Sequence, residues 1–409
     1  MWRKGTQNGS TPVLRSIQRL SLSARLTRKI RNVQPLPSRR FTTIHKSYIQ
    51  CIHSDVIVQI STLLSVTMMI HLQKIMGGND LSVSEAESLL KAIFNEASDA
   101  QIGALLIALK MKGESVSEIA GMAKAMRDSA IRIAPEVAGP LIDTCGTGGD
   151  GTNTINISTA AAIVVASCEI SVAKHGNYAV SSSCGSANVF SELGVGMTLA
   201  PEKVQEAIES LGIGFMLAPV FHPAMKRVAP IRRDLKMKTI FNVLGPLTNP
   251  AGAKNQVIGV YDPGLCETLA KVLQILGTER AMVVHGSGLD EITNTGPTLI
   301  SELDHGSVKS YTTNPEDFGY AQSTLDQIKG GTPFENAQQL VQILKGVKNP
   351  GRDIVCMNAG AALHISGKAD SLFEGARMSE DAIDSGRALE TLKRLVKATG
   401  DPATLGRFL

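Results

Sequence analysis

Residues 70–132 have the spacing of apolar positions that amphipathic helices show, with stripes such as Leu89, Leu90, Ile93 and Phe94. Three helix starts share one polar signature, in which a serine precedes a glutamate or glutamine by three positions. The three pairs are Ser82 with Glu85, Ser98 with Gln101 and Ser115 with Glu118. In such a capping box the two side chains satisfy the free backbone groups at the start of a helix. We therefore expect a small helical unit with the apolar stripes as its core.

From about Pro140 the pattern changes to short apolar runs that alternate with longer helical stretches. This alternation is typical of a parallel sheet covered by helices. The expected strands lie at Pro140–Ile142, Ser171–Ala173, Gln256–Val260 and Ala281–Val284. The predicted fold class is α/β, with a small N-terminal α-helical domain and a large α/β domain built on a mainly parallel central sheet.

The domain organisation follows from these patterns. We expect a leader over residues 1–67, the small helical domain over 68–136 and the α/β catalytic domain over 137–409. A helical segment at about 201–235 is expected to pack on the small domain. A ligand could lie in a cleft between the two domains.

Charge is distributed unevenly along the chain. Residues 1–54 hold 11 Lys or Arg and no Asp or Glu, which is the composition of an organelle transit peptide. The alternative is that translation starts at Met68 or Met69. We expect a soluble protein, located in a plastid or mitochondrion if the leader is genuine and in the cytoplasm if translation starts at one of these methionines. Residues 56–72 are too short and too polar to indicate a membrane span.

The other 355 residues hold 30 basic and 37 acidic side chains. This acidic balance argues against a general nucleic-acid binder, whose affinity rests on neutralising phosphates. The six cysteines form no Cys-x-x-Cys pair, so neither a zinc site nor a disulfide framework is indicated.

The strongest chemical signal is the glycine-rich stretch Asp143–Thr159, which reads as a strand, a turn and the start of a helix. Glycines let backbone N–H groups turn toward an anion, and a helix N-terminus favours negative charge. Ser158 and Thr159 would add hydroxyl donors there. The stretch lacks the Gly-Lys-Ser/Thr of a Walker loop, and a glycine turn alone can also be purely structural.

Three further signals gain weight beside this loop. Lys174-His175-Gly176-Asn177 and the serines of residues 181–186 follow a strand, where an α/β active site usually lies. The adjacent carboxylates Asp290 and Glu291 are hard oxygen ligands suited to Mg²⁺, although an acidic pair alone could be a solvated loop. Arg232 precedes the Gly-Pro loop of residues 241–250 and could hold a carboxylate through two parallel hydrogen bonds.

Together these motifs, in this order over residues 69–397, resemble the anthranilate phosphoribosyltransferase family. The resemblance implies a nucleoside phosphorylase-type fold, commonly homodimeric. It also implies transfer of phosphoribose from phosphoribosyl pyrophosphate (PRPP) to the amine of anthranilate, with Mg²⁺, in tryptophan biosynthesis. Small-molecule substrates are therefore expected, with no nucleic-acid or membrane partner. No residue is assigned as a general acid or base.

The resemblance also assigns site residues by position. PRPP would be bound by Gly146, Gly149, Asp150, Thr154, Asn156, Ile157, Ser158, Thr159, Lys174, Ser181, Ser182 and Ser186. Anthranilate would be bound by Gly146, His175, Asn177, Arg232 and Pro246, with Arg232 directed at its carboxylate. Magnesium would be held by Ser158, Asp290 and Glu291.

The chain departs from the family pattern near the proposed site. Tyr178 stands where the family usually has Arg, and Asn188 stands where it usually has Asp. Phe190-Ser191 replaces Leu-Glu, which is interpreted as a packing change. Tyr178 and Asn188 each replace a charged residue of the family with an uncharged one, next to the proposed site.

Two other functions stay open at this point. A pyrimidine-nucleoside phosphorylase would share the fold, but its expected Lys-His-Ser-Thr-Gly-Gly string is absent. A homologue that binds nucleic acid and has lost transferase activity is opposed by the acidic balance and by the intact glycine-rich loop.

Overall fold

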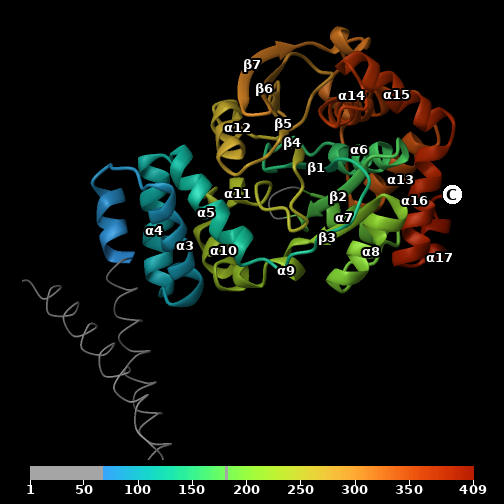
Figure 1. The fold of residues 1–409 in the computed structure, drawn as a ribbon. Coiled ribbons are helices and arrows are strands. Elements are labelled where there is room, and N and C mark those ends of the chain that lie inside the picture. The colour runs from blue at the N-terminus through green and yellow to red at the C-terminus, as the bar shows by residue number, and fades with distance from the viewer. Residues whose placement is uncertain (1–67, 180–182) are drawn as a thin grey trace, which may run out of the picture. The chain divides into compact units, whose positions relative to one another are not determined.

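The computed structural model describes residues 68–179 and 183–409, so the expected leader lies outside the described residues. Residues 68–76 are helical, and α3 (Val83–Asn95), α4 (Asp99–Lys112) and α5 (Val116–Asp128) follow, together forming the small helical part in blue and teal (Figure 1). Each of these three helices begins with its predicted capping box: Ser82, Ser98 and Ser115 each accept from the backbone N–H three residues later. The predicted helical unit is confirmed.

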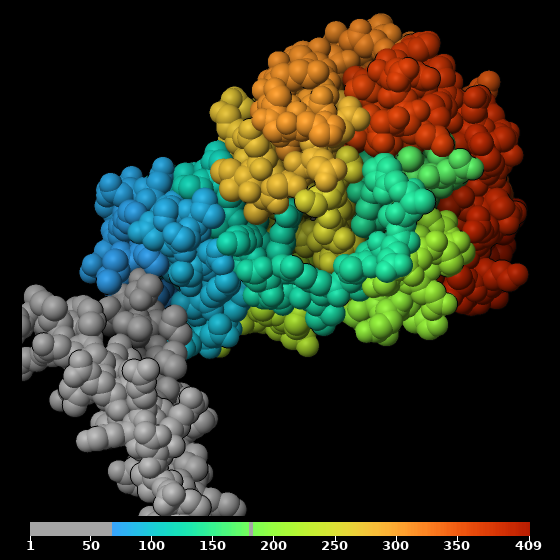
Figure 2. Space-filling model, viewed as in Figure 1, coloured from blue at the N-terminus to red at the C-terminus, as the bar shows by residue number. Residues whose placement is uncertain are grey.

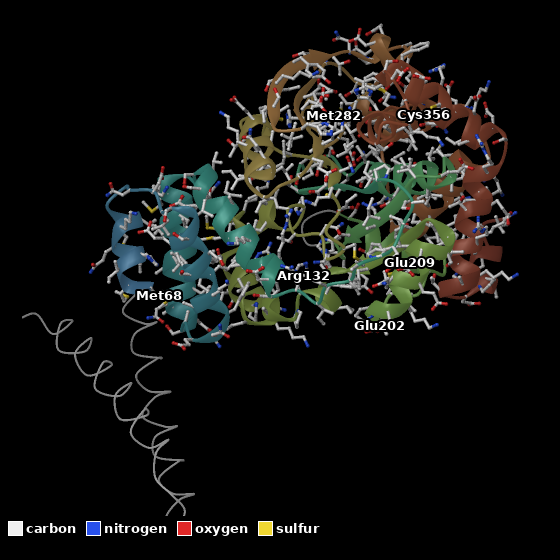
Figure 3. The ribbon with its side chains drawn as sticks, in the orientation of Figure 1. Met68, Arg132, Glu202, Glu209, Met282 and Cys356 are labelled. Atoms are coloured by element: carbon white, nitrogen blue, oxygen red, sulfur yellow. The ribbon has the colours of Figure 1, made fainter. Side chains whose placement is uncertain are left out.

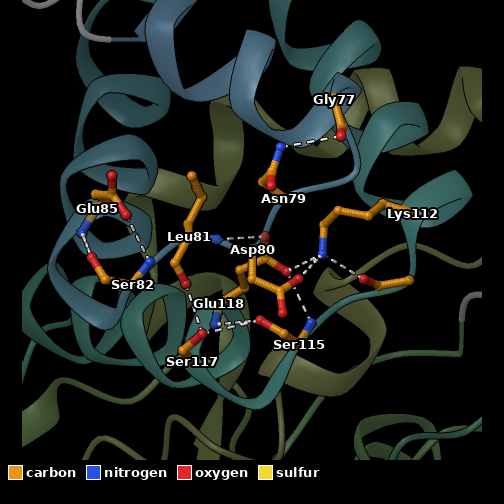
Figure 4. Close-up of polar contacts among 11 residues, drawn as sticks. Gly77, Asn79, Asp80, Leu81, Ser82, Glu85, Lys112, Ser115, Ser117 and Glu118 are labelled. Carbon is orange, nitrogen blue, oxygen red and sulfur yellow. Dashed lines mark hydrogen bonds and ion pairs between the residues drawn. The ribbon is translucent and has the colours of Figure 1, made fainter.

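The capping glutamate of α5 is completely buried and joins all three helices (Figure 4). Glu118 Oε1 accepts from the backbone N–H of Leu81, just before α3, at 3.1 Å. Its Oε2 accepts from the Lys112 ammonium at the end of α4 at 2.9 Å, and from the Ser115 backbone N–H. A buried carboxylate needs such partners because burial removes its hydration. Glu118 therefore fixes the geometry of the small helical part as well as one helix start.

A seven-stranded sheet forms the centre of the α/β part, in the order β3-β2-β1-β4-β5-β6-β7. The pairings from β3 through to β5 are parallel, and those of β6 and β7 are antiparallel. The strands are β1 (Leu141–Gly146), β2 (Ser171–Gly176), β3 (Ile213–Leu217), β4 (Asn255–Gly259), β5 (Arg280–Gly286), β6 (Thr298–Asp304) and β7 (Ser307–Thr313). The mainly parallel sheet and its four predicted strands are confirmed, each at slightly different bounds.

The predicted helical segment at about 201–235 is helical only in part, because a strand interrupts it. α8 (Pro201–Leu211) ends at Gly212, whose φ of 79° is left-handed, and the next five residues form the fully buried strand β3. α8 packs on β3 and on α16 (Arg387–Thr399). Only the later part of the segment contacts the small helical part: the 3-10 helix η1 (Pro223–Arg227) touches α3, and α10 (Ala229–Leu235) touches α4.

Helices cover both faces of the sheet. On one face, α6 (Ile157–Ser167) and α14 (Pro350–Ile365) pack on each other and on the sheet. Met282 of β5 and Cys356 of α14, labelled in Figure 3, are both fully buried in that core. On the other face, α12 (Leu265–Ile275) packs between β5 and α5, so one apolar core joins the sheet to the small helical part.

The remaining elements are short or lie toward the carboxyl end. They are α7 (Ser186–Glu192), α9 (Ala218–Phe221), α11 (Phe241–Leu244), η2 (Pro315–Phe318), η3 (Leu325–Ile328), α13 (Pro333–Leu344), α15 (Leu372–Asp384) and α17 (Pro402–Gly406). No helix in the described part of the chain has the length and apolar character needed to cross a membrane.

The segment between α5 and β1 is tied along its length to the α/β part. The backbone N–H of Ile131 donates to the carbonyl of Phe221 at 2.8 Å, and that of Glu136 donates to the Glu209 carboxylate on α8 at 2.9 Å. Ile133 donates to the Pro250 carbonyl. This connection is therefore a fixed strap rather than a free linker.

Candidate active site

The carboxyl ends of β1, β2, β4 and β5 meet at one edge of the sheet, where parallel α/β folds place their ligands. Gly146, the last residue of β1, pairs in register with Gly259, the last residue of β4. Beyond them the glycine-rich loop lies against the end of β4, since the Thr147 backbone N–H donates to the Gly259 carbonyl at 2.9 Å. Figure 2 shows the part of the surface, in teal, green and yellow, where the chain around this end of the sheet lies.

The glycine-rich loop is bonded directly to the acidic pair. The Gly148 backbone N–H donates to Asp290 Oδ2 at 2.7 Å, and the Ser158 backbone N–H donates to Glu291 Oε1 at 3.2 Å. Asp150 Oδ2 accepts from the Asp290 backbone N–H at 3.4 Å. Two of the motifs singled out in the sequence therefore form one structure, although more than 130 residues separate them.

Two positions beside Asp290, Gly146 and Gly148, require glycine for different reasons. A side chain at Gly146 would lie 3.1 Å from the Asp290 carboxyl carbon, so the close approach depends on the absence of a Cβ. Gly148 itself has a φ of 64°, in the left-handed region that favours glycine.

Loss of hydration makes ionisation of the two carboxyl groups of the acidic pair unfavourable. Burial, with the nearby charge of Asp150, raises the pKa of Asp290 to about 7. Burial and the charge of Asp290 hold the pKa of Glu291 well above its usual range, and the Lys174 ammonium only partly opposes this. A nearby cation would favour the ionised form of both groups.

The residues present fit a magnesium ion. Asp290, Glu291 and the Ser158 hydroxyl are hard oxygen ligands, and the Ser158 backbone N–H lies 3.2 Å from Glu291 Oε1. Mg²⁺ in phosphate-binding sites typically uses one or two carboxylates plus phosphate and water. Within residues 68–179 and 183–409, no group of three or more His, Cys, Asp or Glu could hold a metal alone. Any ion at this point would therefore need oxygen atoms from a ligand.

Lys174 supplies the main buried positive charge beside this point. It projects from β2, is 2% exposed, donates to the Thr144 carbonyl and lies 3.5 Å from Ser158 Oγ. Its ammonium therefore lies on the side of α6 where the N-terminus of that helix also favours an anion.

The other predicted residues of the glycine-rich loop differ in what they can offer. Ile157 and Thr159 have buried side chains, so only their backbone groups can face a ligand. The Asn156 side chain donates to the Cys184 carbonyl at 3.2 Å and accepts from Asn336 at 2.8 Å, which holds the start of α6 in place. Thr154 forms an isolated bridge with Lys329.

The serine-rich segment is only partly described, because Ser181 and Ser182 lie outside the described residues. Ser186 Oγ lies 3.5 Å from the Asn177 carbonyl, at the exposed end of β2. Asn188 Oδ1 accepts from the backbone N–H groups of both Ala179 and Gly185, at 3.0 and 3.1 Å. The neutral amide at 188 therefore still closes this segment on itself. Phe190 packs in the core against Phe215, as the predicted packing change implies.

A second set of buried polar groups follows β2. His175 and His222 are buried with ring centroids 5.1 Å apart, and neither Nε2 has a hydrogen-bond partner among the described residues. Burial lowers the pKa of His222 to about 4 and that of His175 well below its usual range. Both rings are therefore neutral near pH 7.

The Gly-Pro loop lies beside these histidines. Asn249 donates to the buried Asp143 carboxylate and to the Ala173 carbonyl, both at 2.8 Å. Pro246 is buried, and its carbonyl accepts from Gln256 Nε2 at 2.9 Å. The Arg232 guanidinium lies 5.6 Å from the centre of the Phe241 ring, and burial lowers its pKa.

Several supporting residues were not singled out as site residues from the sequence. Asp143, Thr144, Asn249 and Asn358 hold the site through backbone contacts, and His222 faces His175. Asp143, Thr144 and Asn249 stand within the stretches quoted above. Their buried polar side chains inside apolar surroundings were the available signal.

The chain matches two models of the glycosyl transferase family: the helical bundle domain over residues 71–130 and the α/β domain over residues 138–389. Anthranilate phosphoribosyltransferase from Methanococcoides burtonii is 52% identical over 332 residues, which cover 81% of this chain and 94% of that protein. The enzyme of that name from Methanosarcina barkeri is 54% identical over 319 residues, covering 78% and 87%.

Solved structures agree with these relatives. The crystal structure of anthranilate phosphoribosyltransferase from Thermus thermophilus has a TM-score of 0.77 and 43% identity, covering 80% of this chain and 98% of that one. The Saccharomyces cerevisiae enzyme, in complex with PRPP and Mg, has a TM-score of 0.74 and 28% identity, covering 81% and 98%. With identity at this level over four fifths of its length, the chain belongs to the anthranilate phosphoribosyltransferase family.

Proposed function

We propose that this protein transfers phosphoribose from PRPP to the amine of anthranilate, giving N-(5-phosphoribosyl)anthranilate and pyrophosphate in tryptophan biosynthesis. The observation that carries the proposal is the contact of Gly148 with Asp290, which joins the glycine-rich loop to the half-buried acidic pair. The relatives named above support it, since the yeast structure contains PRPP and Mg and a second yeast structure contains 4-fluoroanthranilate.

In this proposal the pyrophosphate of PRPP lies at the glycine-rich loop and the start of α6. Backbone N–H groups of residues 146–159 would donate to phosphate oxygens, and Lys174 would add a buried positive charge. Ser158, Asp290 and Glu291 would hold Mg²⁺, which when bound neutralises charge on the leaving pyrophosphate. Ser181, Ser182 and Ser186 would complete the PRPP site.

Anthranilate would lie on the side of His175, Asn177 and Arg232. The Arg232 guanidinium is free to take a carboxylate, since no hydrogen bond or ion pair joins it to another described residue, and two parallel hydrogen bonds would fix the acceptor's orientation. Neutral imidazoles at His175 and His222 would favour a neutral aromatic ring beside them. Pro246 would line the same pocket.

The reaction then needs little proton transfer from the protein. The bond from C1 of the ribose to the pyrophosphate oxygen breaks, the amine nitrogen bonds to C1, and one amine proton leaves to water. Because the aromatic amine is already neutral near pH 7, no strong base is required. Much of the acceleration would come from holding the amine in line with C1.

This proposal predicts pyrophosphate release that requires PRPP, anthranilate and Mg²⁺ together. The same assay with uridine and phosphate distinguishes a pyrimidine-nucleoside phosphorylase, and a salt-dependent mobility shift with DNA distinguishes a nucleic-acid binder. Pyrophosphate release that does not depend on anthranilate would contradict the proposal.

We further propose that two copies of the chain associate through the small helical part. Met76 and Met111 are 72% and 84% exposed there, and Ile70 is 57% exposed, so each could be covered by a second copy. Sedimentation velocity should give twice the monomer mass, and Met111→Lys should weaken the association. A monomer at micromolar concentration would contradict it.

A further inference from the structure

We propose that Asn358 of α14 is a positioning residue for the acidic pair, and that its amide determines how tightly the protein holds magnesium with PRPP. The inference rests on the proposed function. Asn358 lies on a different element from every residue assigned to the site, and it is 2% exposed.

The Asn358 side chain binds both backbone groups of a single residue. Its Oδ1 accepts from the Ile292 N–H at 3.0 Å, and its Nδ2 donates to the Ile292 carbonyl at 2.7 Å. Nδ2 also donates to the Ile354 carbonyl one turn earlier in α14, at 2.8 Å. The Asn358 amide thus pairs with both backbone groups of Ile292, as a residue of a neighbouring strand would. Its three hydrogen bonds leave the Asn358 side chain little freedom to move.

Ile292 is fully buried and directly follows Glu291. The acidic pair is therefore held from two sides: the Ser158 and Gly148 backbone groups contact the carboxylates, and Asn358 fixes the backbone next to them. Ser158, Glu291 and Asn358 also lie around one small gap between side chains, which is too small to hold a water molecule. Because α6 and α14 pack on each other, a single rigid pair of helices sets both restraints.

This restraint matters because the two carboxyl groups repel each other. Asp150 lies beside them as well, since its Oδ2 accepts from the Asp290 backbone N–H at 3.4 Å, so without restraint the segment would move to separate the charges or reach water. Partners that orient metal ligands in this way typically change metal affinity or activity 10- to 100-fold when they are lost.

The rest of the segment keeps its own anchors. The Thr293 N–H donates to Thr298 Oγ1 at 3.0 Å, and Asn294 Nδ2 donates to the Pro350 carbonyl at 2.8 Å. Loss of the Asn358 amide should therefore loosen the acidic pair without releasing the whole segment from α14.

The test uses the full-length protein with Asn358→Leu, which keeps the branched shape of the side chain and removes all three hydrogen bonds. Asn358→Ala is the second variant, because a water molecule can enter the space and preserve folding if the leucine variant does not fold. Calorimetry gives the Kd of PRPP at saturating Mg²⁺, and Mn²⁺ bound with PRPP is counted by electron paramagnetic resonance. We expect a Kd for the metal complex about 10- to 100-fold weaker, with the KM for anthranilate within about twofold of wild type.

Gln256→Leu is the matched control. Gln256 is equally buried and its amide also holds a backbone carbonyl, that of Pro246, but on the anthranilate side. It should raise the KM for anthranilate and leave the affinity for metal and PRPP within about twofold. Folded Asn358 variants that bind metal and PRPP as wild type does, or that lose affinity for both substrates equally, would overturn the inference. A wild-type protein that binds no magnesium with PRPP would instead overturn the proposed function.

Discussion

The backbone N–H of Gly148 lies 2.7 Å from Oδ2 of Asp290, which joins the glycine-rich loop to the acidic pair. Replacing both acids by amides, Asp290→Asn with Glu291→Gln, keeps an acceptor for Gly148 and removes the charge. We expect binding of PRPP with Mg²⁺ to weaken by at least about 100-fold, since the metal loses its two carboxylates. Calorimetry measures this directly. Unchanged affinity in the double variant would refute the assignment of the metal ligands.

The raised pKa of Asp290 predicts how pH affects the metal-free protein. The folded protein holds a proton on Asp290 up to about pH 7, whereas the unfolded chain releases it near 3.8. The ionised group therefore destabilises the fold, and unfolding free energy should fall as pH rises from about 4 to about 7. Adding Mg²⁺ with PRPP should raise the melting temperature more at pH 8 than at pH 6. Equal shifts at both pH values, by differential scanning fluorimetry, would contradict this.

Arg232 and Arg233 provide a matched pair of adjacent arginines. Arg232 is half-buried beside Phe241, whereas Arg233 is exposed. Arg232→Ala should raise the KM for anthranilate by about 10- to 100-fold, because a charge-assisted contact with its carboxylate is lost. The affinity for PRPP should stay within about twofold, and Arg233→Ala should affect neither. Steady-state kinetics with both substrates varied would show a PRPP defect instead if Arg232 were misassigned.

The buried histidine pair predicts sensitivity to acid. The pKa of His222 is lowered to about 4, so the unfolded chain takes up a proton below pH 6.5 while the folded protein does so only near pH 4. Unfolding free energy should therefore fall as pH drops through this window, by about 3 kcal/mol from His222. Urea titrations at several pH values should show a smaller loss for His222→Asn.

The exposed His305 is the control for this experiment, since its side chain is 72% exposed. His305→Asn should lose as much stability on acidification as the wild type. If His222→Asn and wild type lose the same stability between pH 6.5 and 4, the imidazole is not held neutral.

Asn188 stands where the family usually has Asp, and its side-chain oxygen can accept the same hydrogen bonds as a carboxylate. Asn188→Asp should be tolerated, because a carboxylate accepts equally well from Ala179 and Gly185. Asn188→Ala should raise the KM for PRPP about tenfold, through loss of two hydrogen bonds to the serine-rich segment. Ser191→Ala, at an exposed position on the same helix, is the control. A PRPP dependence unchanged in Asn188→Ala would show that these bonds do not support the site.

Sequence patterns predicted local features well where one residue type meets one physical need. The capping serines and the strand before Gly146 are such cases, because their signals lie within a few residues. β3 was missed because its five residues follow a helix closely and are buried on both sides, so they show neither alternation nor a helical period. The β6–β7 hairpin was missed for a related reason, as β7 is mostly exposed and polar.

The sequence predicted the motifs of the site but not the residues that hold these motifs in place. The glycines, the lysine and the adjacent acids indicate a phosphate-binding site, because both the residue types and their order along the chain are typical of one. Asn358 does not, because its role depends on α14 lying against a segment 66 residues earlier in the chain. Similarly, His222 meets His175 only once β2 and the segment after β3 are packed together.

Anthranilate fluorescence measures the central claim most directly. Purified protein mixed with anthranilate, PRPP and Mg²⁺ should consume the fluorescent acceptor with multiple turnovers, and omitting either PRPP or the metal should stop the reaction. If well-folded protein leaves the fluorescence unchanged while the Thermus thermophilus enzyme removes it under the same conditions, the proposed transfer is contradicted.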